Sequence, residues 1–220
     1  MRKLTRPTHF LTNNDMCGIS AMFCKSEKND YKKLLIVSEI RGQDGTGWIH
    51  HKKEEGIYVV HRSHKKASKM NYIPTTEPGD LIVGQNRLAI FGLDFNNQQP
   101  LTTAETALVH NGNLYDFERV FKEEGLKREY QVDSELILRL WEKYHDIEVI
   151  YEKVKGDFAC ILVDKTKKTV CGFTRDKPLC SYRDETGLYW FSTPRIGKKV
   201  FGDVKIDEWP SGTIRYELFA

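Results

Sequence analysis

Four short polar clusters hold residue types that could carry chemistry. They are Cys17-Gly18, Gln85-Asn-Arg87, His110-Asn-Gly112 and Asp133-Ser-Glu135. A thiol can act as a nucleophile, amide groups can donate to a developing negative charge, and guanidinium and carboxylate groups can hold a charged substrate. The clusters are therefore candidates for a catalytic or binding site.

Each cluster also has an ordinary structural interpretation. A free cysteine such as Cys17 is commonly a small buried residue, and Arg87 alone fits a surface cation. His110-Asn-Gly112 is typical of a strand exit, where Asn or Gly accepts a left-handed turn. Asp133-Ser-Glu135 is an ordinary helix start. The functional prediction therefore depends on the four clusters occurring together.

The clusters stand at the ends of predicted strands or at the start of a predicted helix. Strand ends and loops are where a rigid scaffold presents functional groups. Apolar runs bounded by polar residues predict the strands. These strands are 17–23, 47–52, 56–62, 80–85, 105–110, 158–163, 169–174, 188–192 and 213–218.

Helices are predicted at 30–40, with Asp30 as the cap, at 114–125 and at 133–145. Turns are predicted at 41–47, which contains three glycines, at 53–56 and at 164–168. Strands in clusters and helices in clusters indicate an α+β domain rather than a parallel βαβ fold. We expect this domain to span 17–220 and to follow a tail or removable leader, 1–16.

Composition excludes several classes of function. The chain of 220 residues is 40% hydrophobic and 30% charged, which is typical of a soluble folded protein. No apolar run reaches the roughly 20 residues of a membrane span, and a net charge of +3 gives no argument for nucleic acid. Five scattered cysteines without a secretory signal favour a reducing, cytoplasmic setting. Since CxxC pairs and phosphate-loop motifs are absent, we expect no metal, nucleotide or other cofactor.

The order of the motifs resembles the class II, or amino-terminal-nucleophile (Ntn), glutamine amidotransferases, most closely the glutaminase domain of asparagine synthetases. The similarity covers nearly all of residues 17–220. The matching segments are Cys17-Gly-Ile19, Arg41-Gly-x-Asp44-x-x-Gly47, Arg87-Leu-Ala-Ile90, Gln99-Pro-Leu101, His110-Asn-Gly112, Asp133-Ser-Glu135, Gly156-Asp-Phe-Ala159, Arg175-Asp176, Pro178-Leu179 and Pro210-Ser-Gly212.

The resemblance implies a four-layer αββα sandwich and hydrolysis of L-glutamine to glutamate and ammonia. Cys17 would be the first residue of the mature chain, with its own α-amine as the base. Asn111 and Gly112 would stabilise the oxyanion. Arg87 would bind the substrate carboxylate and Asp133 its ammonium group. Asn113 stands where asparagine synthetases carry Glu, so a negative charge near the substrate amine is missing.

Two further expectations concern processing and partners. The nitrogen of Cys17 lies in a peptide bond, so activity requires cleavage before Cys17, or synthesis from Met16 followed by its removal. The Ser-Gly-Gly-x-Asp-Ser loop of the synthetase domain is absent. A separate ammonia-accepting synthetase subunit is therefore the expected partner.

Two alternatives to a glutaminase remain open. One is a catalytically silent glutamine-binding or regulatory module, and the other is an amidase of the same fold with another substrate.

Overall fold

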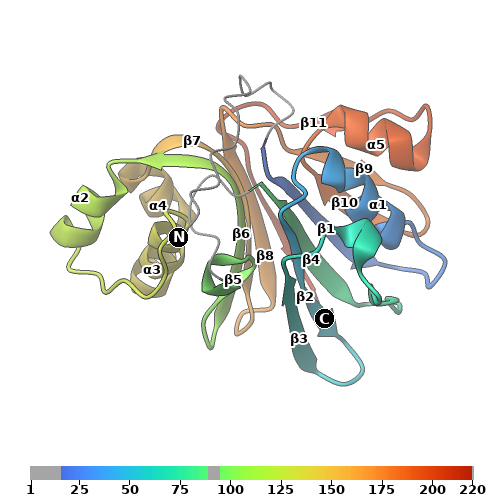
Figure 1. The fold of residues 1–220 in the computed structure, drawn as a ribbon, viewed down its shortest axis with the longest axis horizontal. Coiled ribbons are helices and arrows are strands. Elements are labelled where there is room, and N and C mark those ends of the chain that lie inside the picture. Colours follow the sequence, from blue (N-terminus) through green and yellow to red (C-terminus); the bar gives the residue numbers. More distant parts are fainter. Residues whose placement is uncertain (1–15, 89–94, 220) are drawn as a thin grey trace, which may run out of the picture.

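The computed structural model describes residues 16–88 and 95–219. Two antiparallel β-sheets lie face to face in the middle of the molecule, and helices cover both outer faces (Figure 1). The first sheet has the order β11-β9-β10-β1-β4-β2-β3. Its strands are β1 (Gly18–Cys24), β2 (Gly45–Lys52), β3 (Ile57–Ser63), β4 (Leu81–Arg87), β9 (Cys180–Arg183), β10 (Gly187–Phe191) and β11 (Asp207–Glu208).

The second sheet has the order β12-β8-β7-β6-β5. Its strands are β5 (Leu101–Thr102), β6 (Thr106–Tyr115), β7 (Lys155–Asp164), β8 (Thr169–Arg175) and β12 (Ile214–Leu218). The long β6–β7 pair forms its centre, with residues paired from Thr106↔Asp164 to Tyr115↔Lys155. Beyond the short β5 pairing at Leu108, the other edge of β6 has no strand partner among the described residues. This open edge faces the functional site described below.

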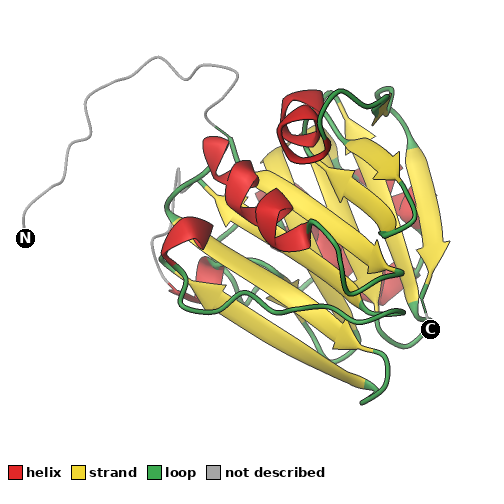
Figure 2. Ribbon diagram, turned by 90° about the vertical axis from the view of Figure 1, so that its right-hand side faces the viewer, coloured by secondary structure: helices red, strands yellow, loops and turns green. Residues whose placement is uncertain are grey.

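Helices divide between the two outer faces (Figure 2). The first sheet is covered by α1 (Tyr31–Val37) and α5 (Pro194–Phe201), and the second by α2 (Phe117–Glu123), α3 (Glu135–Tyr144) and α4 (Ile147–Lys153). Short 3-10 helices occupy Ser38–Ile40, Ala67–Lys69 and Phe95–Asn97. Among the described residues no helix has the length and apolar character needed to cross a bilayer.

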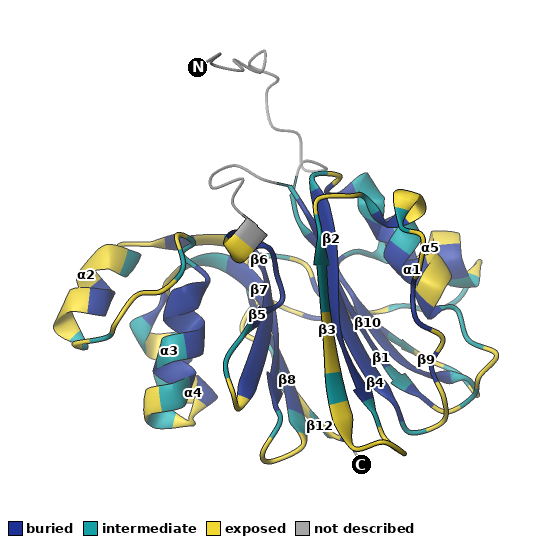
Figure 3. Ribbon diagram, turned by 60° about the horizontal axis from the view of Figure 1, so that its bottom comes forward, coloured by how far each residue is buried: buried dark blue, intermediate teal, exposed yellow. Residues whose placement is uncertain are grey.

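Alternation along the strands separates three apolar layers. Most residues of the inner strands are buried and are coloured dark blue in Figure 3. In β1, Ile19 and Ala21 point between the sheets, whereas Met22 points toward α1 and α5. In β6, Val109 points between the sheets and Leu108 toward the α3 face. The period of two along each strand thus assigns side chains to the layers of an αββα sandwich. The predicted α+β fold is confirmed.

Several predicted boundaries are wrong. The segment His110-Asn-Gly112 was expected at a strand exit but lies inside β6, which continues to Tyr115 because it pairs with β7 along its whole length. The helix predicted at 114–125 consequently begins only at Phe117. Gln85-Asn-Arg87 also lies within its strand, β4. Main-chain pairing between distant segments overrides local sequence signals here.

The glycine-rich turn predicted at 41–47 is shorter, because β2 begins at Gly45. A Cβ atom on Gly47 would lie 2.1 Å from the carbonyl oxygen of Gln99, so this glycine permits close packing of two chain segments. Asp30 occupies the N-cap position of α1 but makes no side-chain cap bond. Instead, Asn29 Oδ1 accepts from the N–H of Tyr31 at 3.2 Å.

Two helices were not predicted, α4 and α5, which contain 7 and 8 residues. The strand β9 was also not predicted, since its 4 residues are too few to show a period. The expected leader, 1–16, lies outside the described residues except for Met16. The Ala89-Ile90 end of the expected Arg-Leu-Ala-Ile strand also lies outside them.

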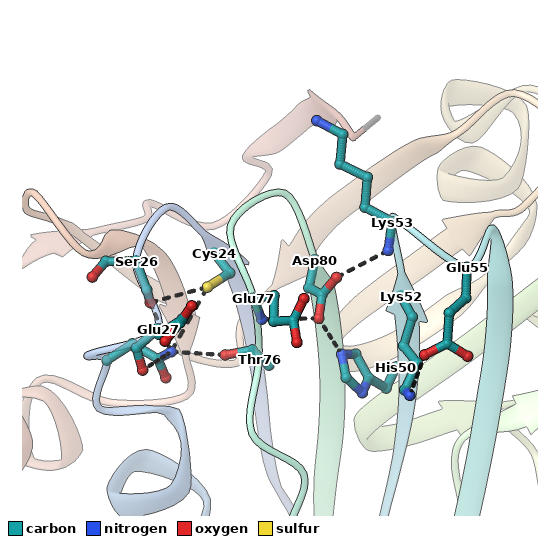
Figure 4. Close-up of polar contacts among 11 residues, drawn as sticks. Cys24, Ser26, Glu27, His50, Lys52, Lys53, Glu55, Thr76, Glu77 and Asp80 are labelled. Atoms are coloured by element: carbon teal, nitrogen blue, oxygen red, sulfur yellow. Dashed lines mark hydrogen bonds and ion pairs between the residues drawn. The ribbon is translucent and has the colours of Figure 1, made fainter.

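A buried aspartate joins two turns at the end of the first sheet (Figure 4). Asp80 Oδ2 lies 2.7 Å from His50 Nε2 and accepts from the N–H of Glu77 at 3.0 Å. Its Oδ1 accepts from the N–H of Lys53 at 2.9 Å. Burial alone would raise the pKa of Asp80, but the hydrogen bonds from Glu77, Lys53 and His50 lower it below its ordinary value. Asp80 therefore stabilises the β2–β3 hairpin connection as a carboxylate.

Candidate active site

A cavity of about 470 Å³ lies at the ends of β1 and β4, beside the open edge of β6 and the start of α3. Its lining includes all six residues that the sequence predicts for the site: Cys17, Arg87, Asn111, Gly112, Asn113 and Asp133. These residues span more than half of the chain length, and both sheets contribute to the set. The antiparallel sandwich thus brings four dispersed polar clusters to one cavity.

Cys17 immediately precedes β1, and its thiol lies against the main chain that follows β4. Cys17 Sγ accepts from the N–H of Leu88 at 3.4 Å and lies 3.6 Å from the Leu88 carbonyl oxygen. Burial raises the pKa of the thiol, while the Leu88 hydrogen bond and the charges of Arg87 and Arg41 act in the opposite direction. Since the raised value keeps the thiol protonated at neutral pH, a nucleophilic Cys17 needs a base.

The loop after α1 holds the main chain around Cys17. Arg41 Nε donates to the carbonyl oxygen of Cys17 at 3.0 Å, and the N–H of Asp44 donates to the carbonyl oxygen of Arg87 at 2.9 Å. Gly42 fits directly against β4, because a Cβ there would lie 2.4 Å from the carbonyl carbon of Arg87 and 2.6 Å from Leu88 N. The glycine therefore allows the loop to fix the strand end that contacts the thiol.

Asn111 projects from β6 with an uncommitted amide. The side chain is 1% exposed, and neither Nδ2 nor Oδ1 has a hydrogen-bond partner within the described residues. A buried amide without partners loses the hydrogen bonds that water would supply, a free-energy cost of about 1–3 kcal/mol. Such a group is a preorganised donor for a ligand oxygen, which would recover that free energy on binding.

Gly112 follows on the same strand, and the pattern of neighbouring bonds indicates where its N–H points. On the open edge of β6 the N–H of His110 donates to Gln99 Oε1 at 2.6 Å, and the N–H of Leu114 donates to Asp133 Oδ2 at 2.7 Å. Alternate residues of a strand direct their N–H groups to the same edge. The Gly112 N–H therefore points to the cavity side, between Gln99 and Asp133.

The backbone at Gly112 also requires glycine. Its φ is +140°, and a Cβ would lie 2.0 Å from the carbonyl oxygen of Asp157 on β7. A side chain at this position would separate β6 from β7 next to the Asn111 amide. The residue type thus preserves both the strand pairing and the direction of its N–H group.

Charged groups stand on two sides of the cavity. Burial lowers the pKa of Arg87, whereas the charges of Cys17 and Asp44 raise it, and the guanidinium remains a cation at neutral pH. On the α3 side, Asp133 accepts from the N–H groups of Leu114 and Ser134 at 2.7 and 2.8 Å. Asn113, also in the lining, is exposed. A ligand carrying both a carboxylate and an ammonium group fits this charge pattern.

Other lining groups were not predicted as site residues. The Leu88 N–H contacts the thiol, while Gln99, His110 and Ser134 form hydrogen bonds next to Asn111 and Asp133. All four residues lie within the motifs noted in the sequence. A main-chain N–H donor such as that of Leu88 cannot be recognised from the residue type, however. Within the described residues no group of three or more His, Cys, Asp or Glu side chains could hold a metal ion.

Known proteins with similar sequences are longer than this chain. A protein assigned as asparagine synthetase [glutamine-hydrolyzing] 1 of Methanocaldococcus jannaschii is 29% identical over 191 residues, covering 82% of this chain and 32% of the relative. The glutamine--fructose-6-phosphate aminotransferase [isomerizing] of Fusobacterium nucleatum is 25% identical over 174 residues, covering 71% and 28%. The chain thus spans about a third of the length of these relatives.

Solved structures share the fold at low identity. Glutamine phosphoribosylpyrophosphate (PRPP) amidotransferase from B. subtilis, complexed with ADP and GMP, superimposes with a TM-score of 0.68 at 17% identity, over 93% of this chain and 49% of that chain. A structure of the allosteric regulatory enzyme of purine biosynthesis gives 0.68 at 18% identity, with the same coverage of 93% and 49%. These likenesses support the sandwich fold.

The model of the glutamine amidotransferase domain family matches residues 85–196. The matched region contains Arg87, Asn111, Gly112 and Asp133, whereas Cys17 precedes it. The match thus covers half of the chain, including the end of β4 and the whole of β6, which border the cavity. With the αββα sandwich and the site described above, this match shows that the chain belongs to the glutamine amidotransferase domain family.

Proposed function

We propose that this chain hydrolyses the side-chain amide of L-glutamine to glutamate and ammonia, with Cys17 as an N-terminal nucleophile. The observation that carries the proposal is the single cavity that Cys17 shares with an uncommitted amide at Asn111, a cation at Arg87 and a carboxylate at Asp133. The family match and the two-sheet fold support the same reaction.

The substrate orientation follows from the charges. Arg87 binds the α-carboxylate of glutamine through its planar guanidinium, and Asp133 binds the α-ammonium group. Each oxygen of Asp133 accepts one main-chain N–H and has a further lone pair for the ammonium. Asn113 borders the same end of the cavity as a neutral contact. The side-chain amide of glutamine then extends toward Cys17.

The reaction proceeds through a covalent thioester. The α-amine of Cys17 takes the thiol proton, and the sulfur attacks the amide carbon to form a tetrahedral oxyanion. The Asn111 Nδ2–H and the Gly112 N–H donate to this oxygen. The C–N bond breaks as the protonated amine returns the proton to the leaving nitrogen, which releases ammonia. Water, activated by the same amine, cleaves the thioester to glutamate and restores the thiol.

The amine must be free for this role. A free α-amine has a pKa of about 7.7–8.0, close to neutrality, whereas a peptide nitrogen is not a base. In the described chain Met16 precedes Cys17, and its N–H donates to the carbonyl oxygen of Arg41 at 3.1 Å. We therefore place the boundary of the working domain between Met16 and Cys17, with 1–16 removed as a leader or by trimming of Met16.

The released ammonia suggests a partner. The two sequence relatives named above are about three times as long as the region they share with this chain, and one is named as a glutamine-hydrolyzing asparagine synthetase. We propose that a separate synthetase subunit accepts the ammonia. Co-purification of the tagged chain from its native host, followed by mass spectrometry, would identify this partner; recovery of the chain alone would argue for a free glutaminase.

The proposal is tested with a chain that begins at Cys17. We expect this chain to release ammonia from glutamine and to be labelled at Cys17 by an electrophilic glutamine analogue. Cys17→Ala should abolish both. Cys24→Ala, which changes a buried thiol at the far end of β1, is the matched control and should retain both. Glutamine binding without turnover or labelling would instead support the silent-module alternative.

A further inference from the structure

A buried hydrogen-bond ring surrounds the proposed oxyanion donor at Gly112. His110 donates its N–H to Gln99 Oε1 at 2.6 Å, and its carbonyl oxygen accepts from Gln85 Nε2 of β4 at 2.6 Å. Its Nδ1 lies 2.7 Å from Ser134 Oγ. His110 therefore binds three different parts of the fold at once: β4, the segment before β5 and the start of α3.

Ser134 closes this ring. Its Oγ accepts from Gln99 Nε2 at 3.2 Å and contacts His110 Nδ1, while its N–H donates to Asp133 Oδ1 at 2.8 Å. Asp133 Oδ2 returns to β6 through the N–H of Leu114. Gly112 lies midway between His110 and Leu114 on the same strand. The ring thus frames the Gly112 N–H with Gln99 on one side and Asp133 on the other.

The direction of one bond in the ring follows from the geometry. Because Gln99 Oε1 accepts the main-chain N–H of His110, its amide orientation is fixed and its Nε2 donates to Ser134 Oγ. The distance of 2.7 Å from Ser134 Oγ to His110 Nδ1 is normal for a hydrogen bond, whereas 3.4 Å to Asp133 Oδ1 is long. The tautomer of His110 decides which of the two groups donates, and in either case the hydroxyl ties the start of α3 to β6.

We propose that Ser134 is a positioning residue for substrate selection: its hydroxyl holds the neighbouring Asp133 at a fixed place relative to the Asn111–Gly112 donors. Ser134 is 2% exposed and His110 is 3% exposed, so water does not replace these bonds in the folded protein. The inference rests on the proposed function for the role of Asp133 as the ammonium ligand. It adds that recognition of the α-ammonium group depends on a hydroxyl that is itself bonded to His110 and Gln99.

The test measures binding in a Cys17→Ala chain that begins at residue 17, so its outcome is independent of turnover. Calorimetry compares glutamine with glutaramate, which is glutamine without its α-amino group. Ser134→Ala should raise the glutamine Kd about tenfold and leave the glutaramate Kd within about twofold. Ser134→Thr, which keeps the hydroxyl, should restore glutamine binding.

If Ser134 had only a general structural role, Ser134→Ala would change the Kd values of both ligands alike. Equal weakening for both ligands, or unchanged binding of both, would overturn the proposal, as would failure of Ser134→Thr to restore the affinity. Ser181→Ala is the matched control, since Ser181 Oγ is a buried acceptor for Trp209 Nε1 at 3.0 Å outside this cavity. It should lower the melting temperature without changing the ratio of the two Kd values. If the Cys17→Ala chain with an unchanged Ser134 does not bind glutamine, the assignment of Asp133 as the ammonium ligand is overturned. If glutamine binds but the chain beginning at Cys17 releases no ammonia, only the proposed catalysis is refuted.

Discussion

At the residue scale, the proposed site contains a buried amide that has no hydrogen-bond partner among the described residues. The Asn111 amide is buried in a cavity wall, and no hydrogen bond within the described residues uses it. The neighbouring His110 has its main-chain N–H, its carbonyl and its ring Nδ1 all engaged. Fixing one residue with three bonds while leaving the next amide uncommitted is the arrangement expected of a preorganised donor.

Removal of this donor should affect the chemical step. We expect Asn111→Ala to lower kcat by about 100-fold to 1,000-fold, because one oxyanion donor contributes on the order of 3 kcal/mol. The KM for glutamine should change less than threefold, since the charged ends of the substrate bind elsewhere. Steady-state ammonia release provides both constants. A large rise in KM at constant kcat would assign Asn111 to substrate binding instead.

Gly42 offers a second test at this scale. In Gly42→Ala the new methyl group meets the main chain of Arg87 and Leu88, which cannot move away as a flexible side chain could. We expect kcat/KM to fall at least tenfold and the free energy of unfolding to fall by about 1–3 kcal/mol.

The control for this change is Gly125→Ala, at φ +64° with no atom within 4 Å of the added Cβ. It should cost about 1 kcal/mol of stability through its backbone conformation and leave kcat/KM unchanged. Equal kinetic losses in both variants, or none in Gly42→Ala, would contradict the role of the loop at Cys17.

The sequence was informative about side chains and uninformative about main-chain groups. Cys17, Arg87, Asn111 and Asp133 could be selected because their types and order resemble a known family. The Leu88 N–H that contacts the thiol could not, since every residue except proline carries an N–H group and only the fold shows where it points. The bonds of Ser134 were missed for a related reason: Asp-Ser-Glu fits a helix start, and that interpretation needs no tertiary partner.

At the scale of elements, β6 shows why the predicted boundaries failed. The local sequence His110-Asn-Gly112 is typical of a chain leaving a sheet, but β7 pairs with the strand as far as Tyr115. The extension places Gly112 and Leu114 on an edge with no neighbouring strand in the described chain, where the Leu114 N–H donates to Asp133 and the Gly112 N–H points to the cavity side. The existence of the strand was predictable from its apolar run, whereas its length depended on pairing with residues 40 or more positions away.

The Asp80 turn provides a pH-dependent test of element stability. The folded-state pKa of Asp80 is depressed, so its contribution is present above the unfolded-state pKa of about 3.9 and is lost as pH falls through the folded-state value. Asp80→Asn should be less stable than the wild type at pH 7, and this difference should shrink as the pH falls below about 4. Urea unfolding at several pH values measures it.

The comparison variant for Asp80 is Asp203→Asn, which changes an exposed carboxylate on a loop after α5. Its stability should follow that of the wild type across the pH range. If the free energy of unfolding of Asp80→Asn stayed below that of the wild type by the same amount from pH 7 to pH 3, the carboxylate charge would not be what joins the two turns.

At the scale of the whole molecule, two stacked sheets place Cys17 and Arg87 from one sheet opposite Asn111 and Gly112 from the other. The clustered strands and helices predicted an α+β fold, and the resemblance supplied the layer arrangement that the structure confirms. Composition and periodicity alone could not give the strand order, because pairings such as β1 with β10 join segments that are far apart in sequence.

If the α-amine of Cys17 is the catalytic base, one residue added in front of it should remove most of the activity. Ammonia release from glutamine is compared between a chain beginning at Cys17 and the same chain with Met16 retained, each N-terminus being verified by intact mass. The chain with Met16 should release ammonia at least about 100-fold more slowly, since the additional residue converts the amine into a peptide nitrogen. Equal rates from both chains, with Met16 still present at the end of the assay, would contradict the role of the α-amine as the base.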